Sequence, residues 1–515
     1  MSYETLSTDL QSCMLYLGTF PKSYKISRKR LTRRWLAEGL LGAQAGYTAE
    51  EIAEKYFSYL LQRNIIRPTD HCTDGTVKTC QVHDMIHEFI VRKSNEESFI
   101  NVVGGHWLMP KVISKVRRLS VHATDHVQEE IEDMNLSRVR SLAVFGTSHK
   151  FPFHFFKFRI VQVLDLEGCR GLKKHHMKRV SEMILLKYLS LRKTDIDRFP
   201  SKIGRLTYLE TLDIRETNVS VLPKSITGLQ LLCKLIGGNK KTRKSLKLPK
   251  EMATRPMVTL RILSGIQIVE GPHALTDLHN YTALRKLLIY KLNLQKDNLA
   301  FQDLMSSIEY LGSGHLQPLE IDDESSEFIN SLDSMATPPR HLTSLQLYGK
   351  LLKVPEWVTY LEDLVKLTIS VTVLRTDTFK LLASMQKLFC VTFSFSAEKQ
   401  DSYIEDIIKE NKQNSGGSIL VPGGEYKSLK LLRFTSPHLP SLTFSEGAMP
   451  ELQRIDLQFT KLEGLRNMDN LASLLEVHLT MNTQADEATR EIVRGLSMAA
   501  TGGSAKKLKV IVDAR

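Results

Sequence analysis

The sequence predicts an α/β protein in which a small N-terminal domain of three helices and a hairpin precedes a long solenoid of short strands. Short segments with two apolar residues around one variable position recur through about four hundred residues. The first hundred residues lack that repeat and show helical spacing of apolar residues, followed by two β-rich segments. At 515 residues the chain exceeds one ordinary globular core, which favours an elongated repeat array.

Three helices are expected within residues 1–98. The first follows apolar residues at helical spacing near the N-terminus. The second begins after Ser27, a suitable N-cap, and ends at Gly39. The third begins at a capping box formed by Thr48 and Glu51. Apolar residues on one side of each helix supply a common core.

A hairpin should follow, with strands at Ile65–Arg67 and Val77–Val82 joined near Asp74 and Gly75. Three helices followed by such a two-stranded wing describe a winged-helix domain. This fold often reads DNA, and the second helix is basic through Arg28, Lys29, Arg30, Arg33 and Arg34. Arginine and lysine alone do not select a base sequence, so stable nucleic-acid binding is not expected, and a nucleic-acid-binding regulator remains an alternative.

The repeats begin after a linker at 99–114 and extend over 115–515. The intervals between the first five are 23, 22, 25 and 23 residues, which is typical of leucine-rich repeats. Less regular pairs continue to Val510 and Val512, with insertions expected near 291–340 and 396–427. The first of these segments could instead hide one or two degenerate turns of the repeat. The first five pairs are Leu119 and Val121, Leu142 and Val144, Leu164 and Leu166, Leu189 and Leu191, and Leu212 and Ile214.

In three repeats a small polar or thiol residue follows the strand, at Cys169, Thr194 and Thr217. Such a residue can satisfy backbone groups at a buried bend, so Cys169 is interpreted as a core thiol rather than a nucleophile. Residues between and just after the apolar pairs should point to the concave face of a horseshoe and bind a protein partner. The predicted partner-binding residues are Asp165, Glu167, Tyr188, Arg192, Lys193, Asp213, Arg215 and Glu216.

The formal charge of +13 is concentrated at Lys25–Arg34, Lys173–Arg179 and Lys240–Lys250. These patches are either solvated or internally paired surface, or they attract nucleic acid, anionic membrane or an acidic protein. Six scattered cysteines indicate a reducing compartment. No signal peptide or membrane-spanning segment is recognised, which predicts an intracellular protein of the cytoplasm or nucleus.

No catalytic constellation is expected. His71, Cys72, Cys80 and His83 lack the spacing of a zinc knuckle, so no metal site is predicted. The phosphate-binding pattern Gly-x-x-x-x-Gly-Lys-Ser/Thr does not occur, and no nucleophile with a base stands out. The chain is therefore predicted not to be an enzyme.

Residues 2–21 and 30–39, together with Val82-His83-Asp84, resemble the winged-helix part of plant nucleotide-binding leucine-rich-repeat disease-resistance proteins of the coiled-coil type. The tripeptide matches the family's Met-His-Asp motif with Val in place of Met. The resemblance implies that His83 lies beside the phosphates of ADP and that Asp84 supports it, within an ADP/ATP switch completed by a P-loop domain. The nucleotide is implied only for a full-length receptor, and His83 otherwise satisfies a turn.

By this resemblance, the chain is expected to be an intracellular plant immune receptor, or a fragment of one that begins midway through its switch. Its repeats would recognise a pathogen effector or a guarded host protein and would also pack against the switch domains. The missing nucleotide-binding and coiled-coil domains would act in cis or in trans. The alternative within the same fold is a noncatalytic decoy or adaptor that binds no nucleotide.

Overall fold

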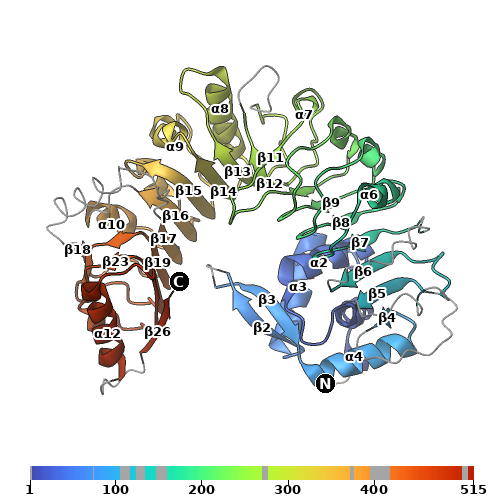
Figure 1. The fold of residues 1–515 in the computed structure, drawn as a ribbon, viewed down its shortest axis with the longest axis horizontal. Coiled ribbons are helices and arrows are strands. Elements are labelled where there is room, and N and C mark those ends of the chain that lie inside the picture. The colour runs from blue at the N-terminus through green and yellow to red at the C-terminus, as the bar shows by residue number, and fades with distance from the viewer. Residues whose placement is uncertain are drawn as a thin grey trace. The chain divides into compact units, whose positions relative to one another are not determined.

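The computed structural model describes the chain with gaps and divides it into two compact units (Figure 1). The first unit ends at Gln267 and also contains Asn280–Leu284, and the second includes Arg285–Arg515. The described residues are 3–72, 75–104, 116–122, 131, 134–146, 158, 160–269, 277–371, 376–394, 418–501 and 508–514.

The N-terminal domain has the predicted helices and wing, and one further short strand makes the wing a three-stranded antiparallel sheet in the order β1-β3-β2. Its elements are η1 (Tyr3–Thr5), α1 (Thr8–Tyr16), η2 (Leu17–Thr19), β1 (Ile26–Ser27), α2 (Arg28–Glu38), α3 (Ala49–Gln62), β2 (Ile66–His71), β3 (Val77–Val82) and α4 (Asp84–Glu96).

The predicted helix limits are confirmed by their caps. Ser27 is the N-cap of α2, and Gly39 ends the helix with a left-handed φ of 68°, which glycine adopts without steric cost. Thr48 and Glu51 form the expected capping box at α3. Trp35 of α2 is fully buried among the apolar faces of the other helices, which fixes α2 within the domain.

In the first unit the repeats form one parallel sheet in which each strand pairs with the next repeat. The strands are β4 (Asn101–Val103), β5 (Arg118–His122), β6 (Ser141–Phe145), β7 (Val163–Asp165), β8 (Tyr188–Ser190), β9 (Thr211–Asp213), β10 (Lys234–Ile236) and β12 (Ile262–Gln267), with β11 (Leu246–Lys247) beside β12. Strand β4 lies inside the expected linker 99–114, so the sheet begins earlier than predicted.

The connections return through short helices on the face of the sheet opposite α2 and α3 (Figure 1). These are α6 (Lys174–Val180), η4 (Ser201–Arg205), η5 (Lys224–Gly228) and α7 (Glu251–Thr254). Leu164, Leu189 and Leu212 lie opposite one another in neighbouring strands and are fully buried. Stacked repeats therefore bury one continuous core, as the period predicts.

The second unit continues the same architecture as a run of parallel strands, each paired with the strand of the next repeat. Its main strands are β13 (Lys286–Leu292), β14 (Pro318–Asp323), β15 (Ser344–Leu351), β16 (Lys366–Val371), β17 (Cys390–Ser394), β19 (Leu431–Thr435), β22 (Arg454–Phe459), β25 (Glu476–Met481) and β26 (Lys509–Ala514).

Helices and short strands of the second unit form its connections. The helices are α8 (Leu299–Ser313), α9 (Glu327–Asn330), η6 (Leu332–Ser334), η7 (Glu356–Tyr360), α10 (Thr376–Ala383), η8 (Met468–Asn470) and α12 (Glu487–Thr501). Strands β18 (Ser418–Val421), β21 (Ser441–Phe444) and β24 (Leu465–Arg466) form a small parallel sheet, and β20 (His438–Leu439) pairs with β23 (Lys461–Leu462).

The two expected insertions differ in outcome. Residues 291–340 contain α8 and β14, and β14 pairs with both β13 and β15, so this segment holds a repeat with a long helix, which confirms the expectation of a hidden turn over that of an insertion. Most of 396–427 lies outside the described residues, and its end supplies β18.

The polar residues after the strands behave as predicted. Thr194 and Thr217 donate their hydroxyls to the carbonyls of Leu191 and Ile214, at 2.6 and 2.8 Å. The Cys169 thiol is buried and lies 3.9 Å from the carbonyl oxygen of Val144, and burial raises its pKa. A protonated buried thiol is a poor nucleophile, which agrees with a packing role.

Gly204 offers a direct test of repeat stacking. A Cβ at this position would lie 2.1 Å from the carbonyl oxygen of Ser225 in the next repeat. We expect Gly204→Ala to destabilise the protein by about 1–3 kcal/mol, because the backbone of η5 must move to relieve the overlap. Gly495→Ala is the control, since a Cβ there would meet no atom within 4 Å. Urea unfolding of both variants distinguishes them, and equal midpoints would contradict the stacking.

Candidate functional site: the interface between winged helix and repeats

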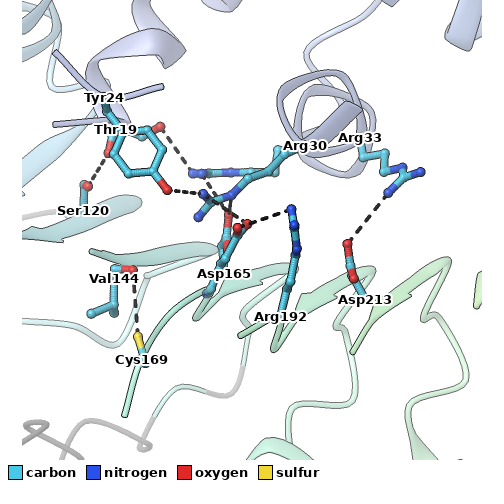
Figure 2. Close-up of polar contacts among 12 residues, drawn as sticks. Thr19, Tyr24, Arg30, Arg33, Ser120, Val144, Asp165, Cys169, Arg192 and Asp213 are labelled. Carbon is cyan, nitrogen blue, oxygen red and sulfur yellow. Dashed lines mark hydrogen bonds and ion pairs between the residues drawn. The ribbon is translucent and has the colours of Figure 1, made fainter. Parts of the chain in front are cut away.

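Helix α2 lies against strands β7 and β8 of the repeat sheet, within the first unit (Figure 2). Helical spacing places Arg30, Arg33 and Arg34 on neighbouring positions of α2, so three guanidinium groups can face the sheet together. The strand ends opposite them carry acidic residues at the variable positions of the repeats. The contact is therefore basic on the helix and acidic on the sheet.

Asp165 at the end of β7 is the centre of this contact. Its Oδ2 accepts a hydrogen bond from Arg30 Nε at 2.6 Å and another from Arg34 Nη1 at 3.1 Å. The Asp165 and Arg34 side chains are fully buried, and that of Arg30 is 6% exposed. The backbone N–H of Glu167 donates to the other carboxylate oxygen of Asp165 at 3.2 Å. One carboxylate thus binds two cations from another domain.

A second set of ion pairs surrounds this centre. Arg30 Nη1 lies 3.3 Å from Glu167, and Arg33 Nη1 lies 3.9 Å from Asp213 on β9. Arg192 lies 3.6 Å from Glu167 and also pairs with Glu216. These outer groups are less buried than Asp165, so each pair is worth less, but together they align neighbouring repeats with the helix.

Aromatic rings enclose the two inner guanidinium groups. Phe145 of β6 lies 5.3 Å from the Arg30 guanidinium carbon, measured to the ring centroid. The Arg34 guanidinium lies 4.8 Å from the Phe20 ring and 5.0 Å from the Tyr16 ring. Cation–π attraction and exclusion of water both strengthen charges held in such a setting.

Two more contacts extend the interface to β5. The Ser120 hydroxyl donates to the carbonyl oxygen of Thr19 at 2.6 Å, and Arg118 pairs with Glu38 at 2.8 Å. His122 lies beside them, with Nε2 3.2 Å from the Ser120 hydroxyl and its ring edge-on to Phe145. Burial lowers the pKa of His122 to about 4, so its imidazole is neutral at physiological pH.

The other end of the interface involves α3. Glu50 accepts from Lys234 Nζ at 3.3 Å and from Arg261 Nη1 at 3.2 Å, which ties the start of α3 to β10 and the residue before β12. Burial opposes ionisation of Glu50, but the two cations, Lys234 foremost, lower its pKa overall. Contacts from α2 and α3 therefore join the winged helix to repeats from β5 to β12.

Charge pairing outweighs desolvation at the central carboxylate. Burial alone would raise the pKa of Asp165, but Arg30 and Arg34 hold it below its ordinary value. The pKa of Arg30 is correspondingly raised despite burial, chiefly by Asp165 and Glu167. The buried charges are therefore ionised together, and removing one leaves the others without compensation.

The predicted partner-binding residues lie on this sheet, but several cannot contact an external partner while the helix is docked. Asp165, Tyr188 and Asp213 are buried, and Glu167 pairs with Arg30. The winged helix covers these residues in this arrangement, and their role in binding an external partner stays a prediction. Arg192, Arg215 and Glu216 stay partly exposed within ion pairs of the sheet, and Lys193 is exposed.

The same contact changes the interpretation of the basic helix. Arg30 and Arg34 are buried against acidic repeat residues, so they are not available to phosphates or base edges in this arrangement. The patch at Lys25–Arg34 is thus largely an internally paired surface. The described part of the chain contains no group of three His, Cys, Asp or Glu residues placed to hold a metal ion.

His83 and Asp84 lie where β3 gives way to α4. His83 is the partly exposed N-cap of α4, and its side chain makes no capping hydrogen bond. Asp84 accepts from the Ser23 hydroxyl at 3.2 Å, which links the start of α4 to the loop before β1. A partly exposed imidazole at the N-terminus of a 13-residue helix fits the chemistry of a phosphate neighbour.

Sequence comparison agrees with this combination of domains. Residues 19–90 match the family model described as "Disease resistance protein Winged helix domain", and residues 138–501 match "Leucine-rich repeat region". The chain belongs to the disease resistance protein family. The two matches include both sides of the interface, since α2 lies in the first and β7 to β9 lie in the second.

The relatives are plant proteins. The chain is 49% identical to disease resistance protein Pik-2 of Oryza sativa subsp. japonica, over 99% of this chain and 53% of the relative. It is 31% identical to disease resistance protein RGA4 of the same rice, over 94% of this chain and 47% of the relative. The chain thus spans about half the length of the curated relatives it matches.

A solved structure of a TDR receptor is 15% identical, with a TM-score of 0.41, and the match covers 78% of this chain and 64% of that one. Of the helices that the structure describes, none is long and apolar enough to cross a lipid bilayer.

Sequence reasoning missed the role of the α2 arginines in joining the domains. One signal of this role was present in the sequence. Arg30 and Arg34 stand next to Leu31 and Trp35, which are core positions of α2, so the basic residues of this helix do not all face solvent. An arginine next to the apolar face of a helix is almost never fully buried unless an acidic residue pairs with it.

Proposed function

We propose that this chain forms the winged-helix and repeat portion of an intracellular plant immune receptor, in which the docked winged helix holds the receptor at rest. The docking of α2 through Arg30, Arg34 and Asp165 supports this proposal. Separating the domains would break these ion pairs and expose the apolar contact of Phe20 and Tyr24 with Phe145 to water, so the docked state persists until another interaction offsets that cost. The chain acts as a binding and switching module without catalysis of its own.

The nucleotide part of the proposal concerns a receptor that also carries a P-loop domain. His83 would hold ADP phosphates in the closed state, and Asp84 would keep the start of α4 in place through Ser23. The helix start supplies N–H groups and a favourable dipole for an anion.

A receptor with His83→Ala is expected to retain less ADP after purification, because a phosphate contact is lost. Met85→Ala, at a 75% exposed position of the same turn, serves as the control. The retained nucleotide is measured by chromatography after denaturation. Equal ADP content in both variants would restrict His83 to a turn and favour an adaptor without nucleotide.

The proposed recognition surface lies on the second unit, because part of the sheet in the first unit is covered by its own helix. Arg433 and Arg454 both pair with Asp456, at 2.6 and 2.5 Å, and Arg454 lies 3.8 Å from Glu476. Arg433 and Asp456 occupy the variable positions of β19 and β22, whereas Arg454 and Glu476 are the first residues of β22 and β25. All four side chains are partly exposed. Arginines already held by carboxylates lose little conformational freedom when a protein such as an effector or guarded host factor binds.

Two variants of a full-length receptor test the proposal with opposite expected results. Asp165→Ala should trigger a defence response without a pathogen, since it weakens the resting contact. Arg433→Ala with Arg454→Ala should abolish the response to the recognised pathogen without causing spontaneous activity. Both responses are measured as cell death in leaves at matched protein levels. The proposed roles would be contradicted if neither variant caused spontaneous cell death and both still responded normally to the pathogen.

A further inference from the structure

Four consecutive repeats of the first unit carry exposed basic residues on the face opposite α2. These residues lie on or beside α6, η4, η5 and α7, and the four helices contact one another in that order. We call them the basic ridge: Lys173, Lys174, Lys178, Arg179, Lys202, Arg205, Lys224, Lys250 and Arg255.

The charge of the ridge is poorly compensated. Of these nine residues only Arg179 has an ion pair among the described residues, with Glu182 at 3.3 Å. Glu251 is the single acidic residue within α6, η4, η5 and α7, and Asp197 pairs with Arg198. A single-sign surface of this kind attracts polyanions at long range.

An apolar column runs beside the ridge. After each of the four helices, three or four residues further along the chain, one apolar side chain is exposed before the next strand begins. These are Ile184, Tyr208, Leu231 and Val258, with exposed fractions of 46%, 50%, 46% and 55%. Four successive repeats thus each expose an apolar residue three or four residues before their strand begins.

We propose that this edge of the first unit binds the surface of a membrane that contains anionic phospholipid. Lysine and arginine side chains would contact the headgroups, while the apolar column enters the boundary of the acyl region. Nucleic acid fits the charge but not the column, because three of its four residues are aliphatic and offer neither stacking nor hydrogen bonds.

The location of the surface agrees with the docked state. The winged helix covers the other face of the same repeats, so the ridge and the column stay accessible while α2 is in place. Membrane binding therefore requires no separation of the domains, and it is independent of nucleotide and of any recognised protein.

Vesicle sedimentation of the full chain tests the proposal. Phosphatidylcholine vesicles with phosphatidylserine should bind the protein, pure phosphatidylcholine vesicles should bind it much less, and added salt should weaken binding. The ridge variant is Lys174→Gln, Lys178→Gln, Lys202→Gln and Lys224→Gln. It should lose binding to vesicles with phosphatidylserine almost completely, since each basic residue near such a surface increases the affinity roughly five-fold.

Matched variants separate the ridge from net charge. The control removes four lysines from the second unit, Lys353→Gln, Lys380→Gln, Lys387→Gln and Lys427→Gln, and should bind like wild type. Tyr208→Ser with Leu231→Ser should bind more weakly at every salt concentration. Circular dichroism should show unchanged melting for all three, because the replaced side chains are exposed.

The proposal is overturned by any of three results. One is equal binding to both kinds of vesicle, and another is equal loss in the ridge and control variants. The third is a ridge variant that loses affinity for single-stranded RNA but keeps its affinity for vesicles.

Discussion

Asp165→Ala is expected to destabilise the first unit by about 3–5 kcal/mol, because it leaves Arg34 buried without its anion and Arg30 with Glu167 alone. Neither arginine can lose its charge at accessible pH, and α2 cannot turn its arginines away while Trp35 anchors it in the core. The domains should therefore separate, or unfold together, at a lower urea concentration. Unfolding followed by tryptophan fluorescence measures the change.

Two further variants identify the cause. Asp197→Ala removes an exposed carboxylate from the same repeats and should change stability by less than about 1 kcal/mol. Arg30→Met, Arg34→Met and Asp165→Leu together replace the buried charges with apolar side chains and should recover most of the lost stability. If the triple variant is as unstable as Asp165→Ala, unpaired charge is not the reason for the loss.

Acidification is the second change with a large expected effect. The pKa of His122 falls from its ordinary value of 6.5 to about 4 in the folded protein, so folding favours the neutral imidazole. This contribution is complete above pH 6.5 and is lost as the pH falls towards 4. The difference between the two pKa values corresponds to about 3 kcal/mol of unfolding free energy. The midpoint of urea unfolding should therefore decrease between these two values.

A substitution at His122 isolates this effect. His122→Phe cannot bind a proton, so the contribution of His122 to the stability change between pH 6.5 and 4 should disappear. Burial also lowers the pKa of His176 to about 4 and lowers that of His87, so part of the change should remain. Asp165 contributes at lower pH, because its pKa is lowered and its stabilising charge is lost only as the pH falls below about 4. An unchanged pH dependence in His122→Phe would assign the acid sensitivity to other groups.

Local sequence features predicted most of the fold. Gly39 ends α2 because a left-handed residue is required there, and the Thr48 and Glu51 side chains satisfy the first amides of α3. Both effects act within a few residues, so they can be recognised in the sequence. The core positions of the repeats can be predicted as directly, because each repeat must bury the same position against its neighbour. These positions include Leu164, Leu189 and Leu212.

The coverage of the sheet could not be predicted in the same way. The alternation that directs Asp165 and Asp213 to one face of the strands says nothing about what lies on that face. Their partners Arg30, Arg34 and Arg33 are more than 100 residues away in the chain. Strand β4 was missed for a different reason, since three residues at the end of an array show no period.

The central claim is that α2 and β7 are joined by buried charges, and a double-mutant cycle between Arg34→Met and Asp165→Leu tests it most directly. Stabilities of the wild type, both single variants and the double variant are measured by urea unfolding at neutral pH. Contact predicts a coupling energy within the range of about 0.5–3 kcal/mol, towards its upper end, because both groups are fully buried. Additivity within about 0.3–0.5 kcal/mol would show that the two residues do not interact, and would contradict the docked interface.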